Sequence, residues 1–235
     1  MIEQAIKYLV KLGNVEAQKI NERFYSTEKL YRIEDPSVDS LQVNTLSGLV
    51  EYVKSEFDTS VSLMVHVVSP TEVRVFDKIN MDKNRDTYIT AHALLPSLSF
   101  NHYYSVEDFN IELQSTFVSN EDRATMLQVV GNVKEEAVNQ IGDDGMSQSV
   151  VARTGVAQVG NVKVPNPVQL MPYRTFLEIE QPESPFVFRM QSGPKCALFE
   201  ADGGAWKLEV MKSIAEYLES ELTDLIGEDR VMLLV

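Results

Sequence analysis

The sequence predicts an α+β fold, a single domain over residues 1–235 with a mostly antiparallel sheet. Hairpin signals outnumber any regular alternation of strands and helices, which favours antiparallel pairing. A helical part is expected over about residues 1–58 and a β-rich body over about residues 60–200. Apolar residues at three- and four-residue steps predict a long amphipathic helix over about residues 205–226.

The N-terminal part is predicted to contain helices around one strand. Apolar residues have helical spacing over 2–10, and this spacing continues weakly to Ile20. A strand is expected over 24–33, before Asp35 and Pro36 end it. Thr45 is placed to cap the next helix. The apolar stripe of that helix consists of Leu46, Leu49, Val50, Val53 and Phe57.

The middle of the chain opens with strands and then has two helices. Strands are predicted over 61–68 and 72–76, joined by a turn over 69–71, and a third strand over 87–95. Ser105 is a natural N-cap for a helix with Phe109, Leu113 and Phe117 on one face. A short further helix is expected after Asn120.

From Leu127 to Phe188 the pattern is predicted to be β-rich. Residues 141–146 form a strong hairpin signal, because Asp-Gly supplies the positive φ values of primed turns. Gly155 and Gly160 mark further turns. Segments 164–168 and 171–173 contain prolines and are therefore expected to be edge strands or extended chain. Segments 177–180 and 185–190 are predicted to form another hairpin.

The C-terminal helix has the clearest periodicity. Gly227 is placed to end it, and Trp206 is expected to pack its first turn against the sheet. Residues 231–235 are uncharged and fit either a terminal strand or a tail that binds a partner. The predicted stripe of this helix consists of Leu208, Met211, Ile214, Ala215, Leu218, Leu222 and Leu225.

Composition limits the possible partners and compartments. The net charge is −14, from 35 acidic and 21 basic residues, and the bases form no local patch. This charge disfavours nucleic-acid binding by one chain, although a basic channel built from several subunits stays possible. A single cysteine, Cys196, excludes an internal disulfide, and its apolar neighbours indicate a buried thiol. We expect a cytoplasmic protein with no membrane span, since no secretory signal or long apolar run occurs.

No catalytic, metal or cofactor site is predicted. His66, His92 and His102 lie in no metal-binding spacing and are interpreted as structural. Asp143 and Asp144 resemble a metal or acid–base pair, but a Gly-Asp-Asp-Gly turn uses such aspartates for the turn itself. The serines lack a nucleophile elbow.

Two segments are candidates for ligand binding. The first contains arginines in the β-rich half, and the aromatic neighbours of Arg174 could stack on a ligand. In so acidic a chain, however, arginines more often neutralise carboxylates. The second is the strand–helix junction, where glycine amides could hold a phosphate or carboxylate. Asp202 as a helix cap is the preferred interpretation of that junction. The candidate residues are Arg153, Tyr173, Arg174, Asp202, Gly203 and Gly204.

Five motifs stand out in the sequence: residues 45–52 (TLSGLVEY), 143–148 (DDGMSQ), 164–168 (VPNPV), 172–176 (PYRTF) and 198–204 (LFEADGG). Together they resemble an uncharacterised protein family of tailed bacteriophages and prophages. The resemblance implies a phage-encoded, non-virion accessory protein in the host cytoplasm, and it supplies no catalytic residues.

The leading hypothesis for function is a non-enzymatic accessory protein that forms homo-oligomers and binds a host protein or a small anionic ligand. The proline-containing extended segments and the apolar C-terminus favour assembly by strand addition. One alternative is a metal-dependent enzyme of nucleotide or nucleic-acid metabolism, with Asp143, Asp144, Glu200 and Asp202 around a divalent cation. Another is a ring-forming accessory protein of DNA recombination.

Overall fold

The structure is a computed structural model, and the chain divides into two compact units, residues 1–38 and 39–235. Organisation as a single domain therefore stays a prediction. Within 17–26 and 141–163 the backbone alone is described. The described residues are 2–4, 8, 13, 17–20, 23–26, 39–59, 61–79, 84–131, 141–143, 148–150, 153–154, 157–158, 162–163, 166–191 and 195–235.

The first unit contains a short hairpin. Residues 2–4, 8 and 13 are helical, and strand β1 (Ala17–Ile20) pairs with β2 (Arg23–Ser26) in antiparallel register. The predicted helical continuation to Ile20 is wrong, because residues 17–20 are bonded across the hairpin. The predicted strand at 24–33 is confirmed for its first three residues, and 27–33 lie outside the described part.

The second unit contains two larger sheets, each with its own apolar core, as well as the short strands of 141–163. The first, with the helices on it, is called here the five-stranded lobe. Its strand order is β16-β4-β5-β6-β3. Pairs β4–β5 and β5–β6 are antiparallel, and pairs β16–β4 and β3–β6 are parallel. The strands are β3 (Leu41–Val43), β4 (Leu63–Ser69), β5 (Glu72–Phe76), β6 (Thr87–His92) and β16 (Val231–Leu234).

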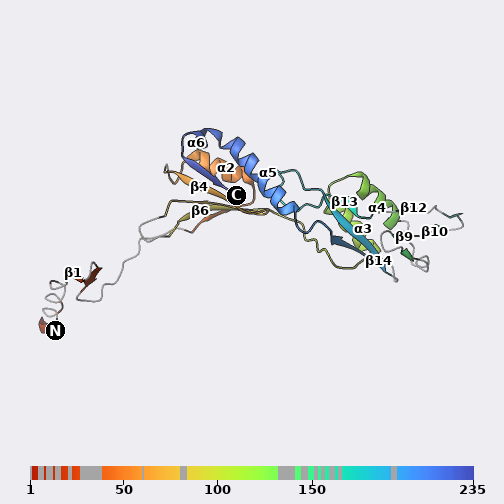
Figure 1. The fold of residues 1–235 in the computed structure, drawn as a ribbon, viewed down its shortest axis with the longest axis horizontal. Helices are drawn as coiled ribbons and strands as arrows, with labels where there is room; N and C mark the ends of the chain where they lie inside the picture. The colour runs from red at the N-terminus through yellow and green to blue at the C-terminus, as the bar shows by residue number, and fades with distance from the viewer. Residues whose placement is uncertain are drawn as a thin grey trace. The chain divides into compact units, whose positions relative to one another are not determined.

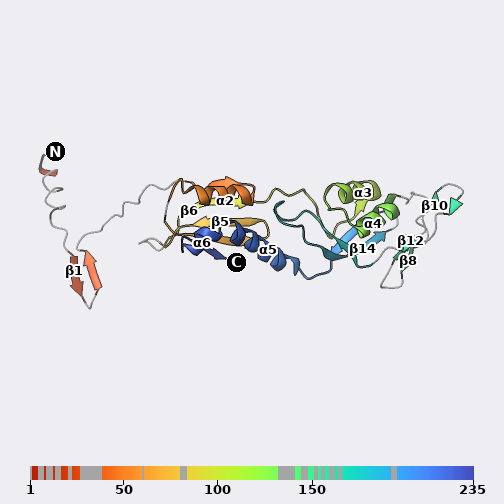
Figure 2. The ribbon, with the colours of Figure 1, turned by 90° about the horizontal axis from the view of Figure 1, so that it is seen from above.

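Three helices cover one face of this sheet: α2 (Leu46–Ser55), α5 (Trp206–Glu221) and α6 (Thr223–Gly227). Figure 2 shows α2 on one side of this face and α5 and α6 on the other. Alternate strand residues, such as Val65 and Val75, are fully buried under the helices. Their neighbours Met64 and Phe76 are only half-buried, so they belong to the opposite face.

Helix α2 agrees with the sequence at its start and differs at its end. The Thr45 side chain accepts a hydrogen bond from the Gly48 amide at 3.1 Å, which confirms the predicted cap. The stripe from Leu46 to Val53 is buried, but Phe57 is 86% exposed. The helix ends at Ser55, and Glu56 has a φ of 52°, so the chain leaves the helical path before Phe57.

The predicted C-terminal helix is two helices that meet at Leu222. Its buried side chains follow four-residue steps from Trp206 through Val210, Ile214 and Leu218. Leu208, predicted to be on the buried stripe, is 58% exposed, because the burial of Trp206 fixes a different face toward the core. The predicted end at Gly227 is confirmed. Residues 231–234 form a strand of the chain's own sheet and not a free tail, and Val231 pairs with Leu63.

The second sheet and its helices are called here the four-stranded lobe. Its strand order is β13-β14-β15-β7, and all pairs are antiparallel. Helices α3 (Val106–Ser115) and α4 (Glu121–Gly131) pack on it around a core that includes Phe109, Phe186 and Phe188. The strands are β7 (Tyr104–Ser105), β13 (Val168–Leu170), β14 (Ser184–Gln191) and β15 (Lys195–Glu200).

Most local predictions for this lobe are confirmed. The Ser105 hydroxyl caps α3 by accepting from the Asp108 amide at 3.1 Å, and Phe109 and Leu113 are buried on one face of the helix. Phe117 is also buried, but it lies beyond the helix, which ends at Ser115, and forms a β-bridge with Pro172. Strand β13 lies at the sheet edge, as its neighbouring prolines require. The predicted β-rich region does not begin at Leu127, because α4 continues to Gly131.

The hairpin predicted for 177–180 and 185–190 is wrong. Residues 177–179 form a turn, in which the Ile179 amide donates to the Phe176 carbonyl at 3.2 Å. The Gln181 side chain also donates to the Phe176 and Ile179 carbonyls and so holds this turn closed. Strand β14 takes its partners from β13 and β15 instead.

Short strands occupy the described parts of 141–163. Strands β8 (Ile141–Asp143) and β9 (Gln148–Val150) pair in antiparallel register, which confirms the predicted hairpin, while turn residues 144–147 lie outside the described part. Strand β12 (Val162–Lys163) adds to β9, and β10 (Arg153–Thr154) pairs with β11 (Ala157–Gln158). No helix in the described residues has the length and apolarity needed to cross a membrane.

Candidate functional site

Arg174 is the centre of the best-defined polar cluster. It lies on the segment between β13 and β14, and only 6% of it is exposed. Its backbone amide donates to Oε1 of Gln181 at 2.9 Å, and the neighbouring Tyr173 amide donates to the Thr116 carbonyl at 2.9 Å. These two bonds fix the backbone, so the side chain is directed into the protein.

The guanidinium group of Arg174 joins three elements. Nη1 lies 3.3 Å from Oε1 of Glu200 at the end of β15. Nη2 donates to the Pro182 carbonyl at 3.3 Å and to the Ser184 hydroxyl at the start of β14. The planar group also stacks on the first residue of α5, with Cζ 3.9 Å from the ring centroid of Trp206.

Burial dominates the electrostatics of this arginine. It lowers the pKa of Arg174 to about 10, while Glu200 and Asp202 act in the opposite direction. The group therefore stays charged at neutral pH. Nε of Arg174 and Nε1 of Trp206 are both buried and have no hydrogen-bond partner among the described residues.

The junction between β15 and α5 begins with Asp202. Its Oδ1 accepts from the Gly204 amide at 2.9 Å, and its Oδ2 accepts from the Trp206 amide at 3.4 Å. Gly203 and Gly204 have φ values of 63° and 83°, which only glycine adopts readily. The predicted capping role is confirmed in part: Asp202 bonds the first helical amide, although Ala205 occupies the N-cap position.

The structure thus gathers some of the predicted ligand-binding residues. Arg174 and Asp202 interact electrostatically, Gly204 is bonded to Asp202, and Tyr173 is half-buried beside Arg174. Arg153 lies in β10, where the backbone alone is described. Sequence reasoning missed the partners of Arg174, namely Gln181, Ser184, Glu200 and Trp206. Among these, only the lone tryptophan, two residues after Gly204, gave a signal in the sequence, and that signal indicated packing.

The polar groups of this cluster bind one another, so the cluster acts as a structural anchor. Nη1 and Nη2 already donate to protein acceptors, and the Asp202 carboxylate occupies the Gly204 amide that an anion would need. An anionic ligand would have to displace one of these bonds. The residues are better placed to hold β14, β15 and α5 together than to exchange a ligand.

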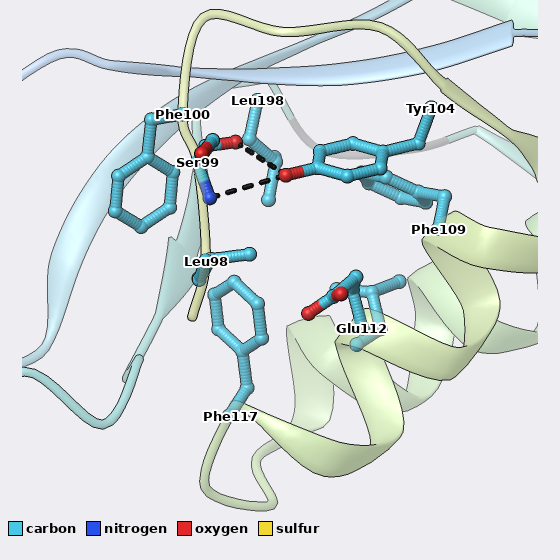
Figure 3. Close-up of a pocket in the computed structure, with 9 residues that line it drawn as sticks. Leu98, Ser99, Phe100, Tyr104, Phe109, Glu112, Phe117 and Leu198 are labelled. Carbon is cyan, nitrogen blue, oxygen red and sulfur yellow. Dashed lines mark hydrogen bonds between the residues drawn. The ribbon is translucent and has the colours of Figure 1, made fainter. Parts of the chain in front are cut away.

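A small pocket lies inside the four-stranded lobe (Figure 3). It is hollowed between α3, the segment before β7, and β15, and it holds about 10 Å³ of free space. The side chain of Glu112 points into it (Figure 3), and its Oε2 is buried with no hydrogen-bond partner among the described residues. The other lining residues are Leu98, Ser99, Phe100, Tyr104, Phe109, Leu113, Phe117 and Leu198.

A second, wider hollow of about 180 Å³ lies near the start of β4. Its charged lining residues are Asp77, Lys78, Arg85 and Asp229. Asp77 is already bonded to the Tyr88 hydroxyl at 3.1 Å, and the Arg85 side chain donates to the Asp77 carbonyl at 3.3 Å. The charged lining residues carry both signs and define no ligand.

Groups that could bind metal are dispersed in the described part of the chain. No three His, Cys, Asp or Glu residues lie together there. His66 contacts the Phe76 ring at 5.9 Å, and His102 contacts the Tyr104 ring at 5.0 Å. Cys196 is fully buried, and burial raises the pKa of its thiol to about 12.

Comparison of the chain with protein-family profiles, with curated proteins and with solved structures finds no match.

Proposed function

We propose that the protein is a non-enzymatic binding protein that assembles with copies of itself through the outer edge of β16. In the setting that the sequence resemblance implies, it acts as a phage-encoded accessory protein in the host cytoplasm, on a host factor or a small anionic ligand. The observation that carries the proposal is an uncharged edge strand on which Met232 and Leu234 are exposed.

Strand β16 lacks the features that protect sheet edges. It is the outermost strand beside β4, and residues 231–235 contain no charged residue and no proline. Met232 is 58% exposed and Leu234 is 40% exposed. Natural monomers usually protect such edges with charges, prolines or bulges, since unpaired backbone groups template pairing with another chain.

The face of the sheet that carries no described helix extends this apolar edge inward. Met232 pairs in register with Met64, and Met64 pairs with Phe76, so the three lie in one row across β16, β4 and β5. A second copy related by a two-fold axis would pair β16 with β16 and join two such rows. The same strand would serve both partners, which makes a second copy the occupant that fits best.

Light scattering coupled to size-exclusion chromatography tests this assembly. The wild-type protein at micromolar concentration is expected to be at least a dimer. The double variant Met232→Lys/Leu234→Lys is expected to be a monomer with an unchanged circular dichroism spectrum, because both side chains are exposed and four like charges would meet at the two-fold axis.

The matched control is Leu177→Lys/Leu208→Lys, which adds the same charge at two exposed leucines far from β16 in sequence. It is expected to assemble like the wild type. A monomeric wild type, or equal dissociation of both double variants, would contradict the proposal.

A further inference from the structure

The pocket of Figure 3 contains an unsatisfied acceptor. Oε2 of Glu112 is buried, and a carboxylate oxygen buried without a donor is costly. The Tyr104 hydroxyl in the lining is already used: Tyr104 Oη donates to the Ser99 carbonyl at 3.0 Å and accepts from the Ser99 amide at 3.1 Å. Both bonds are drawn in Figure 3. A group that satisfies Glu112 must therefore bring its own donor.

The walls of the pocket favour a donor that is positively charged. Phe100, Tyr104, Phe109 and Phe117 line it with aromatic rings, whose faces attract cations. The only formal charge in the lining is the carboxylate of Glu112. The net charge of −14 further raises the local concentration of cations around the protein.

The size of the pocket restricts the shape of that cation. Its free space of about 10 Å³ holds a group about as large as one water molecule. An ammonium head has this size, whereas a guanidinium or quaternary ammonium group is larger. Because this space holds the head alone, the alkyl chain of such a cation would have to lie along the apolar rim of the pocket.

We propose that this pocket binds the ammonium head of an unbranched primary amine, either a free alkylamine or a lysine side chain of a partner. Glu112 accepts the ammonium N–H, the aromatic rings of the lining contact the head, and the alkyl chain lies along the apolar rim. The site is separate from the β16 edge, so it goes beyond the assembly function and does not depend on it.

Titration of the ¹⁵N-labelled full chain with n-butylammonium chloride tests the proposal. Amide shifts are expected in the segments that line the pocket, around Ser99, Tyr104 and Glu112. 1-Butanol has nearly the same shape without the charge, and it is expected to bind about tenfold more weakly or not at all. Equal binding of the two compounds would overturn the proposal.

Two variants separate the pocket from general attraction to an acidic protein. Glu112→Gln keeps the shape and is expected to weaken butylammonium binding by about tenfold, as for the loss of a charged hydrogen bond. Glu107→Gln removes one charge from an exposed position on the same helix and is expected to leave binding unchanged. Equal weakening by both variants would show non-specific attraction and overturn the proposal.

A further titration with two peptides distinguishes a free amine from a lysine side chain of a partner. A blocked Gly-Lys-Gly peptide is compared with its norleucine counterpart in the same titration. Binding of the lysine peptide as well as butylammonium indicates a partner side chain, and binding of butylammonium alone indicates a free amine. If neither butylammonium nor the lysine peptide shifts the amide signals, the pocket holds only water and the proposal fails.

Discussion

At the scale of single residues, the role of a side chain depends more on its three-dimensional surroundings than on its residue type. Arg174 was a candidate ligand-binding residue from its aromatic neighbours in sequence, but its guanidinium is held by Ser184, Glu200 and Trp206. The last two of these are more than twenty residues away along the chain. No local pattern indicates which distant carboxylate or ring an arginine meets. By contrast, the burial of Cys196 was predicted correctly, because its apolar neighbours share one buried strand.

The thiol of Cys196 is expected to be unreactive in the folded protein. Its pKa of about 12 leaves on the order of one thiolate in ten thousand at about pH 8, where an exposed thiol is substantially ionised. A chromogenic disulfide reagent should therefore modify the protein only as fast as it unfolds. In urea, the same reaction should be complete at once.

The pH dependence follows from the same shift. The unfolded thiol ionises near its ordinary pKa, whereas the folded thiol keeps its proton to higher pH. This group therefore contributes stability that is fully present below about pH 8 and is lost as the pH rises toward 12. Rapid modification of the native protein at about pH 8 would contradict the prediction.

At the scale of elements, the sequence predicted where helices begin better than where they end. Hydroxyl caps are local signals, and both Thr45 and Ser105 act as predicted. The ends depend on tertiary structure. Helix α2 ends two residues before Phe57, and the C-terminal helix breaks at Leu222, where a buried leucine keeps its place in the core.

Two residues of α2 test this difference. Leu49→Ala is expected to lower the free energy of unfolding by about 3 kcal/mol, because it leaves a cavity at a fully buried position. Phe57→Ser removes a larger apolar side chain but is expected to change stability by no more than about 0.5 kcal/mol. Urea denaturation followed by circular dichroism measures both values. A larger loss for Phe57→Ser would mean that the ring is covered in solution.

At the scale of the whole molecule, the sequence predicted hairpins and missed long-range pairing. Strands β4 and β5 follow each other across a short turn, and their pairing was predicted from alternation. The parallel pairs β16–β4 and β3–β6 join segments far apart in sequence. The predicted hairpin of 177–180 and 185–190 was wrong because contacts with residues far away in the sequence decide the structure of this segment. Residues Phe176 and Ile179 are instead buried in the core of the five-stranded lobe.

The segment around Arg174 therefore makes contacts with both lobes of the second unit. The Thr175 hydroxyl donates to the Pro70 carbonyl of the five-stranded lobe at 2.6 Å, while Arg174 is bonded to β14 and β15 of the four-stranded lobe. These contacts make the segment a connection between two apolar cores.

Replacing Arg174 tests the strength of that connection. Arg174→Met is expected to lower the free energy of unfolding by about 2 kcal/mol, because it leaves the Glu200 carboxylate and the Ser184 hydroxyl without their donor. Arg189→Met, on the half-buried side of β14, removes the same charge and should cost less than about 1 kcal/mol. Urea unfolding at neutral pH compares the two. Equal losses would show that Arg174 is not an anchor.

Trp206 gives this protein a built-in optical reporter. It is the only tryptophan in the chain, and its indole lies under a guanidinium at the point where β15 passes into α5. The intrinsic emission excited at the tryptophan band is therefore a single-site signal from the junction of the two lobes. Any event that moves α5 away from Arg174 is expected to shift that emission without an added label.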